Sequence, residues 1–142
     1  MCYAFGMKLF LTSYVSSLVV LAILDGIWLK LIAKSYYQNA LQHLLAPTVR
    51  WLPVILFYLL YAAGLSLLVV LPQAKLSSGT AIGAFGYGAL LGFTAYAAYD
   101  LTNLATLHRW PVTMSLVDLA WGTCMTGVAS LVAFLVLKRF WS

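Results

Sequence analysis

The sequence has 142 residues, of which 64% are hydrophobic and only 8% are charged. A mean hydropathy of +0.98 lies far outside the range of a soluble globular domain, so the composition predicts an integral membrane protein. The formal net charge is +5, but the eight basic residues are scattered at the ends of apolar runs. Because they form no basic surface, we expect no nucleic-acid partner.

Four apolar runs are each long enough to cross a bilayer, which takes about 20 residues of helix. Lipid offers no hydrogen-bond partners to an exposed backbone, and the runs lack the alternating pattern of barrel strands. We therefore predict an all-α fold, a four-transmembrane-helix bundle that forms a single integral membrane domain over residues 1–142. The predicted helices cover approximately residues 9–31, 52–71, 80–107 and 112–137.

The connection between the first two predicted helices is amphipathic. Within residues 35–46, Tyr37 and Leu41 share one helical face, whereas Gln38 and Gln42 share the other. This pattern predicts a short interfacial helix, which would act either as a connector on the membrane surface or as a lid over a binding site.

Prolines are expected to mark the ends of helices. Pro47 should end the interfacial helix, and Pro53 should lie in the first turn of the second apolar helix. Pro72 and Pro111 should lie in the connections that follow the second and third apolar runs.

Basic residues do not decide the orientation in the membrane. Two sides can be defined: one holds both chain termini, and the other, the loop face, holds the first and third connections. Each side has four Lys or Arg residues, so the positive-inside rule gives no preference. The termini side has Lys8, Lys75, Lys138 and Arg139, and the loop face has Lys30, Lys34, Arg50 and Arg109.

The three acidic residues of the chain, Asp25, Asp100 and Asp118, all fall inside apolar runs. A carboxylate at membrane depth costs a few kcal/mol or more unless it faces a cavity or a partner, so each is a functional candidate. At ~1.5 Å per residue, each lies ~9 to 11 Å from a helix end at the loop face. We therefore expect the three carboxylates to occupy one layer near that face.

Spacing along the third apolar run predicts which way its polar residues point. Gly88, Gly92, Tyr96, Asp100 and Asn103 follow one another at intervals of three or four residues and so form one helical stripe. Glycines permit close approach of another helix, so the polar half of the stripe should also face the bundle interior.

Two Asp-x-x-Trp pairs repeat this association of an acid with an aromatic ring. We interpret Asp25 with Trp28 and Asp118 with Trp121 as carboxylates beside aromatic walls, on two sides of a shared pocket. Structural ion pairs and an interfacial aromatic belt are the alternative explanations. The predicted ligand-binding residues are Asp25, Trp28, Tyr96, Asp100, Asn103, Asp118 and Trp121, with Lys30, Arg50 and Arg109 as counter-ions.

Three stretches resemble the signature of a known family of small bacterial membrane proteins. They are residues 99–107 (YDLTNLATL), Trp110-Pro111 and Asp118-x-x-Trp121-Gly122. The family is catalogued as a domain of unknown function. The resemblance implies a multi-pass protein of the bacterial inner (cytoplasmic) membrane, and it implies no activity.

These patterns leave several functions open. The first hypothesis is a pocket at the loop face that binds, and in an enzymatic version modifies, a membrane lipid or another amphiphile, with one Asp as general acid or base. The others are a small proton-coupled transporter, as a homodimer, and an accessory subunit of a larger membrane complex. Carboxylates can bind divalent cations, but no close Asp spacing supports a metal site, and Cys2 and Cys124 form no thiolate site. The residues identify no cofactor, substrate or reaction.

Overall fold

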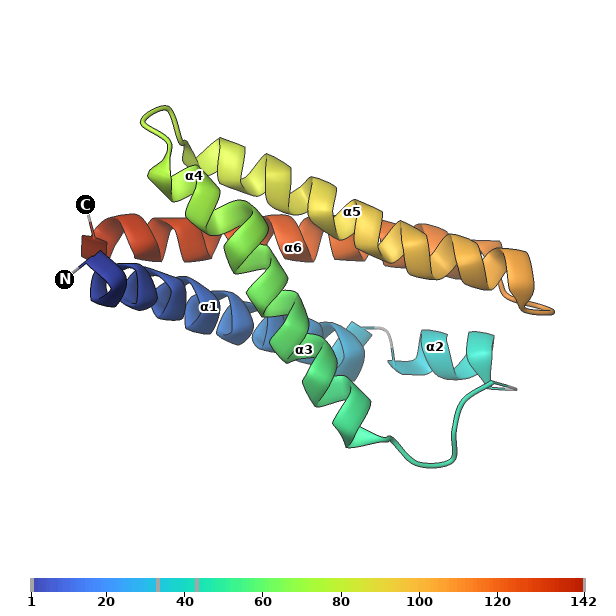
Figure 1. The fold of residues 1–142 in the computed structure, drawn as a ribbon. Coiled ribbons are helices and arrows are strands. Elements are labelled where there is room, and N and C mark those ends of the chain that lie inside the picture. Colours follow the sequence, from blue (N-terminus) through green and yellow to red (C-terminus); the bar gives the residue numbers. More distant parts are fainter. Residues whose placement is uncertain (1, 33, 43, 142) are drawn as a thin grey trace.

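The computed structural model describes residues 2–32, 34–42 and 44–141, and this part of the chain is helical without strands. Four of its helices are long and apolar enough to cross a membrane, which confirms the all-α fold class and a multi-pass membrane protein. The two chain ends lie at the same end of the bundle, and α2 lies at the opposite end (Figure 1). The spans are Gly6–Leu31, Trp51–Lys75, Ala81–Thr106 and Val112–Phe140.

The first span and the short helix after it meet the loop face. Helix α1 covers Cys2–Ile27 and continues into a π-helical turn, η1, at Trp28–Ile32. Helix α2 covers Lys34–Leu41 and is shorter than the predicted 35–46. Beyond its end, the backbone N–H groups of Leu44 and Leu45 both donate to the Leu41 carbonyl, at 2.7 and 3.0 Å.

The second span runs on past the proline that was expected to lie in a connection. Helix α3 (Trp51–Leu65), the π-helical turn η2 (Ser66–Val70) and α4 (Leu71–Lys75) are continuous, so the prediction for Pro72 was wrong. In η2 the N–H of Leu71 donates to the Ser66 carbonyl, five residues back. This wider turn immediately precedes Pro72, whose ring nitrogen has no hydrogen to donate, and lets the helix accommodate it.

The third and fourth spans pack closely as antiparallel neighbours. Helix α5 covers Ala81–Thr106 and α6 covers Val112–Trp141. A Cβ atom on Gly88 would lie 2.5 Å from the Cβ of Ser130, and one on Gly92 would lie 2.2 Å from the carbonyl oxygen of Gly122. The predicted close packing through these two glycines is thereby confirmed.

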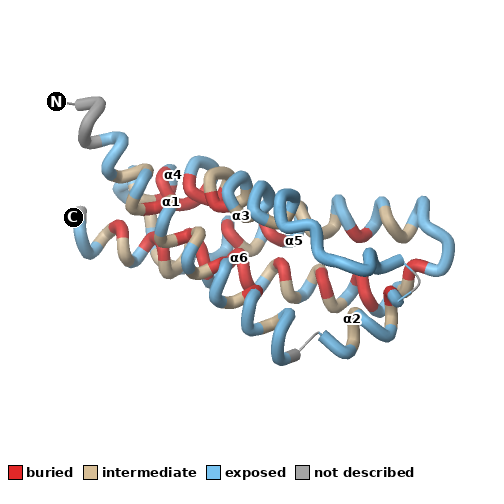
Figure 2. Tube along the Cα trace, turned by 90° about the horizontal axis from the view of Figure 1, so that it is seen from below, coloured by how far each residue is buried: buried red, intermediate tan, exposed pale blue. Residues whose placement is uncertain are grey.

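The interior of the bundle has an apolar part and a polar part. Helix α1 packs on both α6 and α3, and α3 crosses the bundle obliquely (Figure 1). Buried positions lie where α1, α3, α5 and α6 face one another (Figure 2). Leu21, Leu65, Val70 and Phe134 belong to the apolar core in the middle of the bundle and toward the termini. The buried carboxylates lie nearer the loop face.

Candidate functional site

The three aspartates are all buried, and they lie toward the same end of the bundle. Asp25 on α1, Asp100 on α5 and Asp118 on α6 are 8%, 0% and 7% exposed. Helices α1 and α5 end at the loop face, where α6 begins (Figure 1). Asp118 lies near enough to both Asp25 and Asp100 to interact electrostatically with each of them.

Asp25 joins three helices through hydrogen bonds from aromatic side chains. The Tyr58 hydroxyl on α3 donates to one oxygen of the carboxylate. The Trp121 indole N–H on α6 donates to the other oxygen at 3.1 Å. Because both donors come from elements distant in sequence, this carboxylate helps to fix how α1, α3 and α6 pack together.

The Asp118 carboxylate accepts a hydrogen bond from a side chain of α2. The Tyr37 hydroxyl donates to its carboxylate, and the Trp28 indole N–H donates to the Tyr37 oxygen at 3.5 Å. Burial of the Tyr37 hydroxyl, and next its hydrogen bond to Asp118, raise the pKa of Tyr37 well above its usual range. Tyr37 therefore stays protonated and remains a hydrogen-bond donor at neutral pH.

The two Asp-x-x-Trp pairs are connected crosswise. Trp121 donates to the acid of the other pair, and Trp28 reaches Asp118 through Tyr37. The two indole rings stack at a centroid distance of 4.4 Å with 9° between their planes. The Trp121 indole therefore donates directly to α1, whereas the Trp28 indole donates to Tyr37 on α2. We call Asp25, Asp118, Trp28, Trp121, Tyr37 and Tyr58 the polar cluster.

Asp100 differs from the other two acids. It is fully buried against α6, and neither carboxylate oxygen has a hydrogen bond of ordinary geometry within the described residues, although the Ser115 hydroxyl interacts with it. Ser115 itself accepts a hydrogen bond from the Trp110 indole N–H at 3.0 Å. Asn103, one turn farther along α5, is half-buried and interacts with Tyr99.

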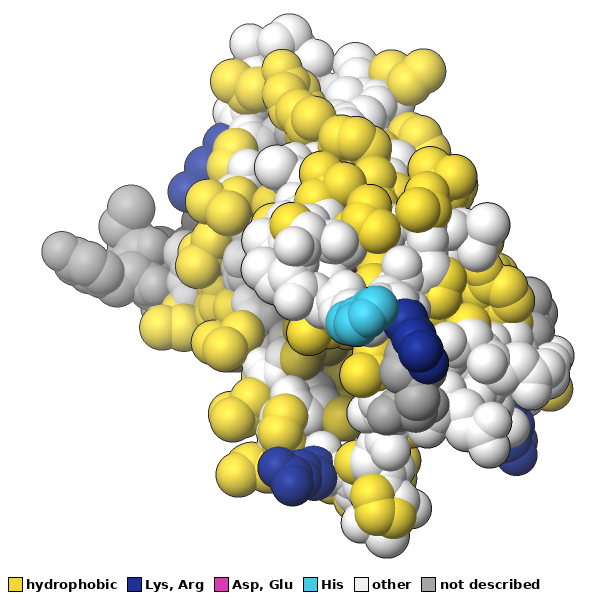
Figure 3. Space-filling model, turned by 90° about the vertical axis from the view of Figure 1, so that its right-hand side faces the viewer, with side chains coloured by type: hydrophobic (Ala, Val, Ile, Leu, Met, Phe, Trp, Pro, Cys, Tyr) yellow, Lys and Arg dark blue, Asp and Glu magenta, His cyan; other side chains and the backbone are white. Residues whose placement is uncertain are grey.

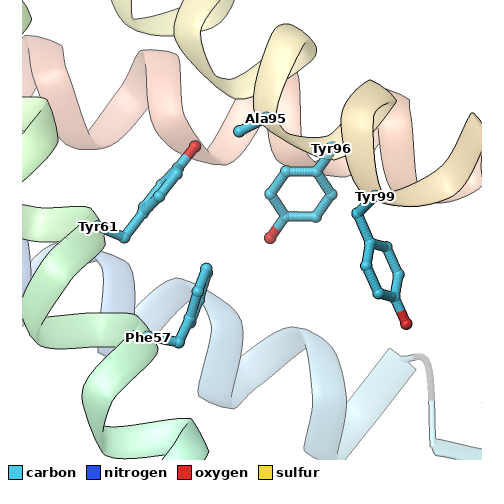
Figure 4. A pocket seen from close by; sticks show the side chains of 5 residues that line it. All are labelled: Phe57, Tyr61, Ala95, Tyr96 and Tyr99. Carbon is cyan, nitrogen blue, oxygen red and sulfur yellow. The ribbon is translucent and has the colours of Figure 1, made fainter. Parts of the chain in front are cut away.

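Tyr96 lies between the aspartates and a cavity. Its ring packs over Gly122, where an added Cβ would come within 2.2 Å of the ring. Its hydroxyl is near enough to Asp25 and Asp118 for an electrostatic interaction. The same residue lines a cavity of about 420 Å³ between α3 and α5, together with Phe57, Tyr61, Ala95 and Tyr99, and its hydroxyl points into that space (Figure 4).

A second cavity continues this space along α3. It has a volume of about 280 Å³ and shares Phe57 and Tyr61 with the first. Leu60 in its wall is 71% exposed, and Tyr99 in the wall of the first cavity is 56% exposed, so the space opens on the membrane-facing side of the bundle. We call the two cavities the α3–α5 groove. Its lining residues are Phe57, Leu60, Tyr61, Gly64, Leu91, Ala95, Tyr96 and Tyr99.

The basic residues proposed as counter-ions lie at the surface. Lys30, Arg50 and Arg109 are exposed, whereas the hydrogen-bond donors to Asp25 and Asp118 are tyrosine and tryptophan. Viewed from the loop face, Lys and Arg side chains and a histidine are visible and no acidic side chain is (Figure 3). Within the described ranges, no group of three His, Cys, Asp or Glu side chains could hold a metal ion.

Sequence reasoning missed the tyrosines that meet the acids and line the groove. The sequence pattern assigns Tyr37 to the apolar face of the interfacial helix, and Tyr58 and Tyr61 lie within an apolar run. The spacing of Tyr58 and Tyr61, three residues apart and so on one face, was an available signal, because a buried tyrosine hydroxyl needs a partner. The Tyr61 hydroxyl is hydrogen-bonded to the Thr126 hydroxyl of α6, with 2.8 Å between the two oxygens.

Comparisons with known proteins agree with this architecture. Residues 10–135 match the model of a family described as predicted membrane protein (DUF2177). Neither the comparison with curated proteins nor that with solved structures gave a match. Since the matched residues include all three aspartates and most of every span, the chain belongs to this family of predicted membrane proteins.

Proposed function

We propose that this protein binds a membrane lipid or another amphiphile in the α3–α5 groove, with the polar end of the ligand directed toward the polar cluster. The observation that carries the proposal is that the groove and the buried carboxylates meet at Tyr96. A mostly apolar cavity with a few polar groups at one end is the usual form of a small-molecule site.

The position of the groove supports entry from the bilayer. Its walls belong to two spans, and exposed side chains such as Leu60 border it. An acyl chain could therefore move between lipid and groove without crossing water. The motif resemblance to bacterial inner-membrane proteins makes the cytoplasmic membrane of a bacterium the proposed location.

Lipid analysis of the purified protein tests this function. Ala95 lines the groove, whereas Ala98, three residues along α5, is exposed and does not. We expect a defined amphiphile to copurify with the wild type and with Ala98→Phe, and to be lost from Ala95→Phe, because the larger ring fills the groove. Equal lipid composition in all three preparations, measured by mass spectrometry, would show that the groove holds no specific ligand.

A further inference from the structure

We infer that the polar end of this ligand carries a positive charge, as a protonated amine does; the inference rests on the proposed function. The first reason is the set of acceptors in the interior. Asp25, Asp100 and Asp118 are buried, and in the described part of the chain the side chains that donate hydrogen bonds to Asp25 and Asp118 are neutral and aromatic. Lys30, Arg50 and Arg109 remain at the surface. Among the described residues, the interior thus presents carboxylates without a buried cation beside them.

Asp100 provides a second observation, independent of the clustering of acids. It is 0% exposed, and neither of its oxygens has a hydrogen bond of ordinary geometry in the described part of the chain. The Ser115 hydroxyl that interacts with Asp100 has a single hydrogen to donate, so at least one of the two buried oxygens lacks a donor. A buried acceptor without a donor is costly and is usually satisfied by water or a ligand. Asp100 follows Tyr96 by four residues and so lies one turn farther along the same face of α5.

The donors that reach Asp25 and Asp118 are already in use. The hydroxyl hydrogens of Tyr37 and Tyr58 and the indole N–H of Trp121 point at carboxylates or at groups bound to them. A phosphate or carboxylate headgroup would bring further acceptors next to acidic groups and would find these donors engaged. An ammonium group brings only donors and a charge of the opposite sign, so it complements the site.

The aromatic lining favours the same headgroup. Phe57, Tyr61, Tyr96 and Tyr99 form most of the wall of the larger cavity (Figure 4). The face of an aromatic ring attracts a cation, and this attraction strengthens where water is excluded. An ammonium group passing from the groove toward Asp25 would therefore meet aromatic rings along its route.

Three amphiphilic probes with identical alkyl chains test the headgroup: an ω-bromo fatty amine, the matching alcohol and the matching carboxylate. The full-length protein in a neutral detergent is titrated with each probe, and quenching of its tryptophan fluorescence by the bromine atom is measured. We expect saturable quenching, with half-saturation by the amine at a concentration at least about tenfold lower than by the other two. Asp25→Asn and Asp100→Asn should remove this preference, and Thr94→Val, on the exposed side of α5, should keep it.

The possible results separate the two proposals. Saturable binding of all three probes with equal affinity, or preference for the alcohol or carboxylate, overturns the amine inference and leaves the groove as a binding site. Quenching that rises without saturation for every probe overturns the proposed function itself. Displacement of the bound amine by ethanolamine at equal concentration would show that the occupant is a free polar amine and not an amphiphile. The preference of the wild type decides the inference even if an aspartate variant fails to fold.

Discussion

The Tyr58 hydroxyl and the Trp121 indole N–H approach Asp25 from two different helices, and the Tyr37 hydroxyl approaches Asp118 from a third. Hydrogen bonds to a charged acceptor contribute more than bonds between neutral groups, and a buried acceptor that loses its donor is costly. At the scale of single residues, we therefore expect these aromatic donors to matter for stability as well as for the chemistry of the site.

Replacing Tyr58 with Phe should destabilise the protein by about 1–3 kcal/mol, because a buried carboxylate loses one of its hydrogen bonds while the ring is kept. The control is Tyr87→Phe on α5, where the side chain is 58% exposed and the change should have an effect within about 0.5 kcal/mol. Unfolding of the detergent-solubilised variants by heat or denaturant measures the difference. Equal stability of the two variants would mean that Asp25 does not depend on Tyr58.

Tyr37 gives a prediction for pH dependence. Its pKa is raised by burial and by the hydrogen bond to Asp118, so the folded protein keeps this proton where the unfolded chain loses it, above about pH 10. Folding stability from Tyr37 is thus present below that pH and is lost as pH rises beyond it. The measurement is the increase in tyrosinate absorbance of the folded protein as the pH is raised through about 10. We expect the same increase in the wild type and in Tyr37→Phe, because Tyr37 does not ionise in this range. A loss of one tyrosine's amplitude there would show that Tyr37 titrates normally.

At the scale of helices, α5 and α6 form the closest pair, and two π-helical turns adjust the other spans. One of these turns, η1, contains Trp28, which bonds to Tyr37 and stacks on Trp121. The other, η2, precedes Pro72. Both turns shift the rotation of the residues that follow, so they influence which side chains reach the interior.

Close packing of α5 on α6 predicts a strong effect at Gly92. Gly92→Leu should destabilise the bundle by about 1–3 kcal/mol or more. Even the Cβ atom of the new side chain would lie 2.2 Å from a backbone oxygen, so the two helices must move apart. Gly86→Leu on the same helix is the control, since nothing lies within 4 Å of an added Cβ there. Thermal unfolding in detergent compares them, and similar midpoints would contradict the contact between the helices.

At the scale of the whole molecule, the spans of 25 to 29 residues are longer than the bilayer core requires. At ~1.5 Å per residue they measure ~38 to 44 Å against a hydrocarbon thickness of ~30 Å. Their ends therefore extend into the interface or the helices tilt. The oblique course of α3 (Figure 1) is consistent with tilt, and the α3–α5 groove lies on one side of that helix.

Four crossings place successive connections on opposite sides of the membrane. In a variant without Cys2 and Cys124, Thr48→Cys before α3 and Ser78→Cys between α4 and α5 should react with a membrane-impermeant maleimide from opposite sides. Both positions are exposed. Labelling of both from the same side would contradict the four-span topology. The experiment would also give the orientation that the balanced basic residues leave open.

Sequence alone was sufficient for the fold class, the four spans and the glycine contact of α5. Hydrophobic length, helical periodicity and the cost of a charge in lipid are properties of single segments and can be read without knowing their neighbours. The passage of the second span through Pro72 depended on the π-helical backbone bonding of η2, which periodicity does not encode.

Only the tertiary structure decided which side chains meet. Tyr37, Tyr58 and Trp121 donate to acids on other elements, and the α3–α5 groove exists because α3 crosses obliquely while α5 stays against α6. These contacts depend on crossing angles and on the rotation of each helix about its axis, to which many weak packing interactions contribute together. A stripe on one helix shows which residues face inward, but the partner of each residue is set by the other helices.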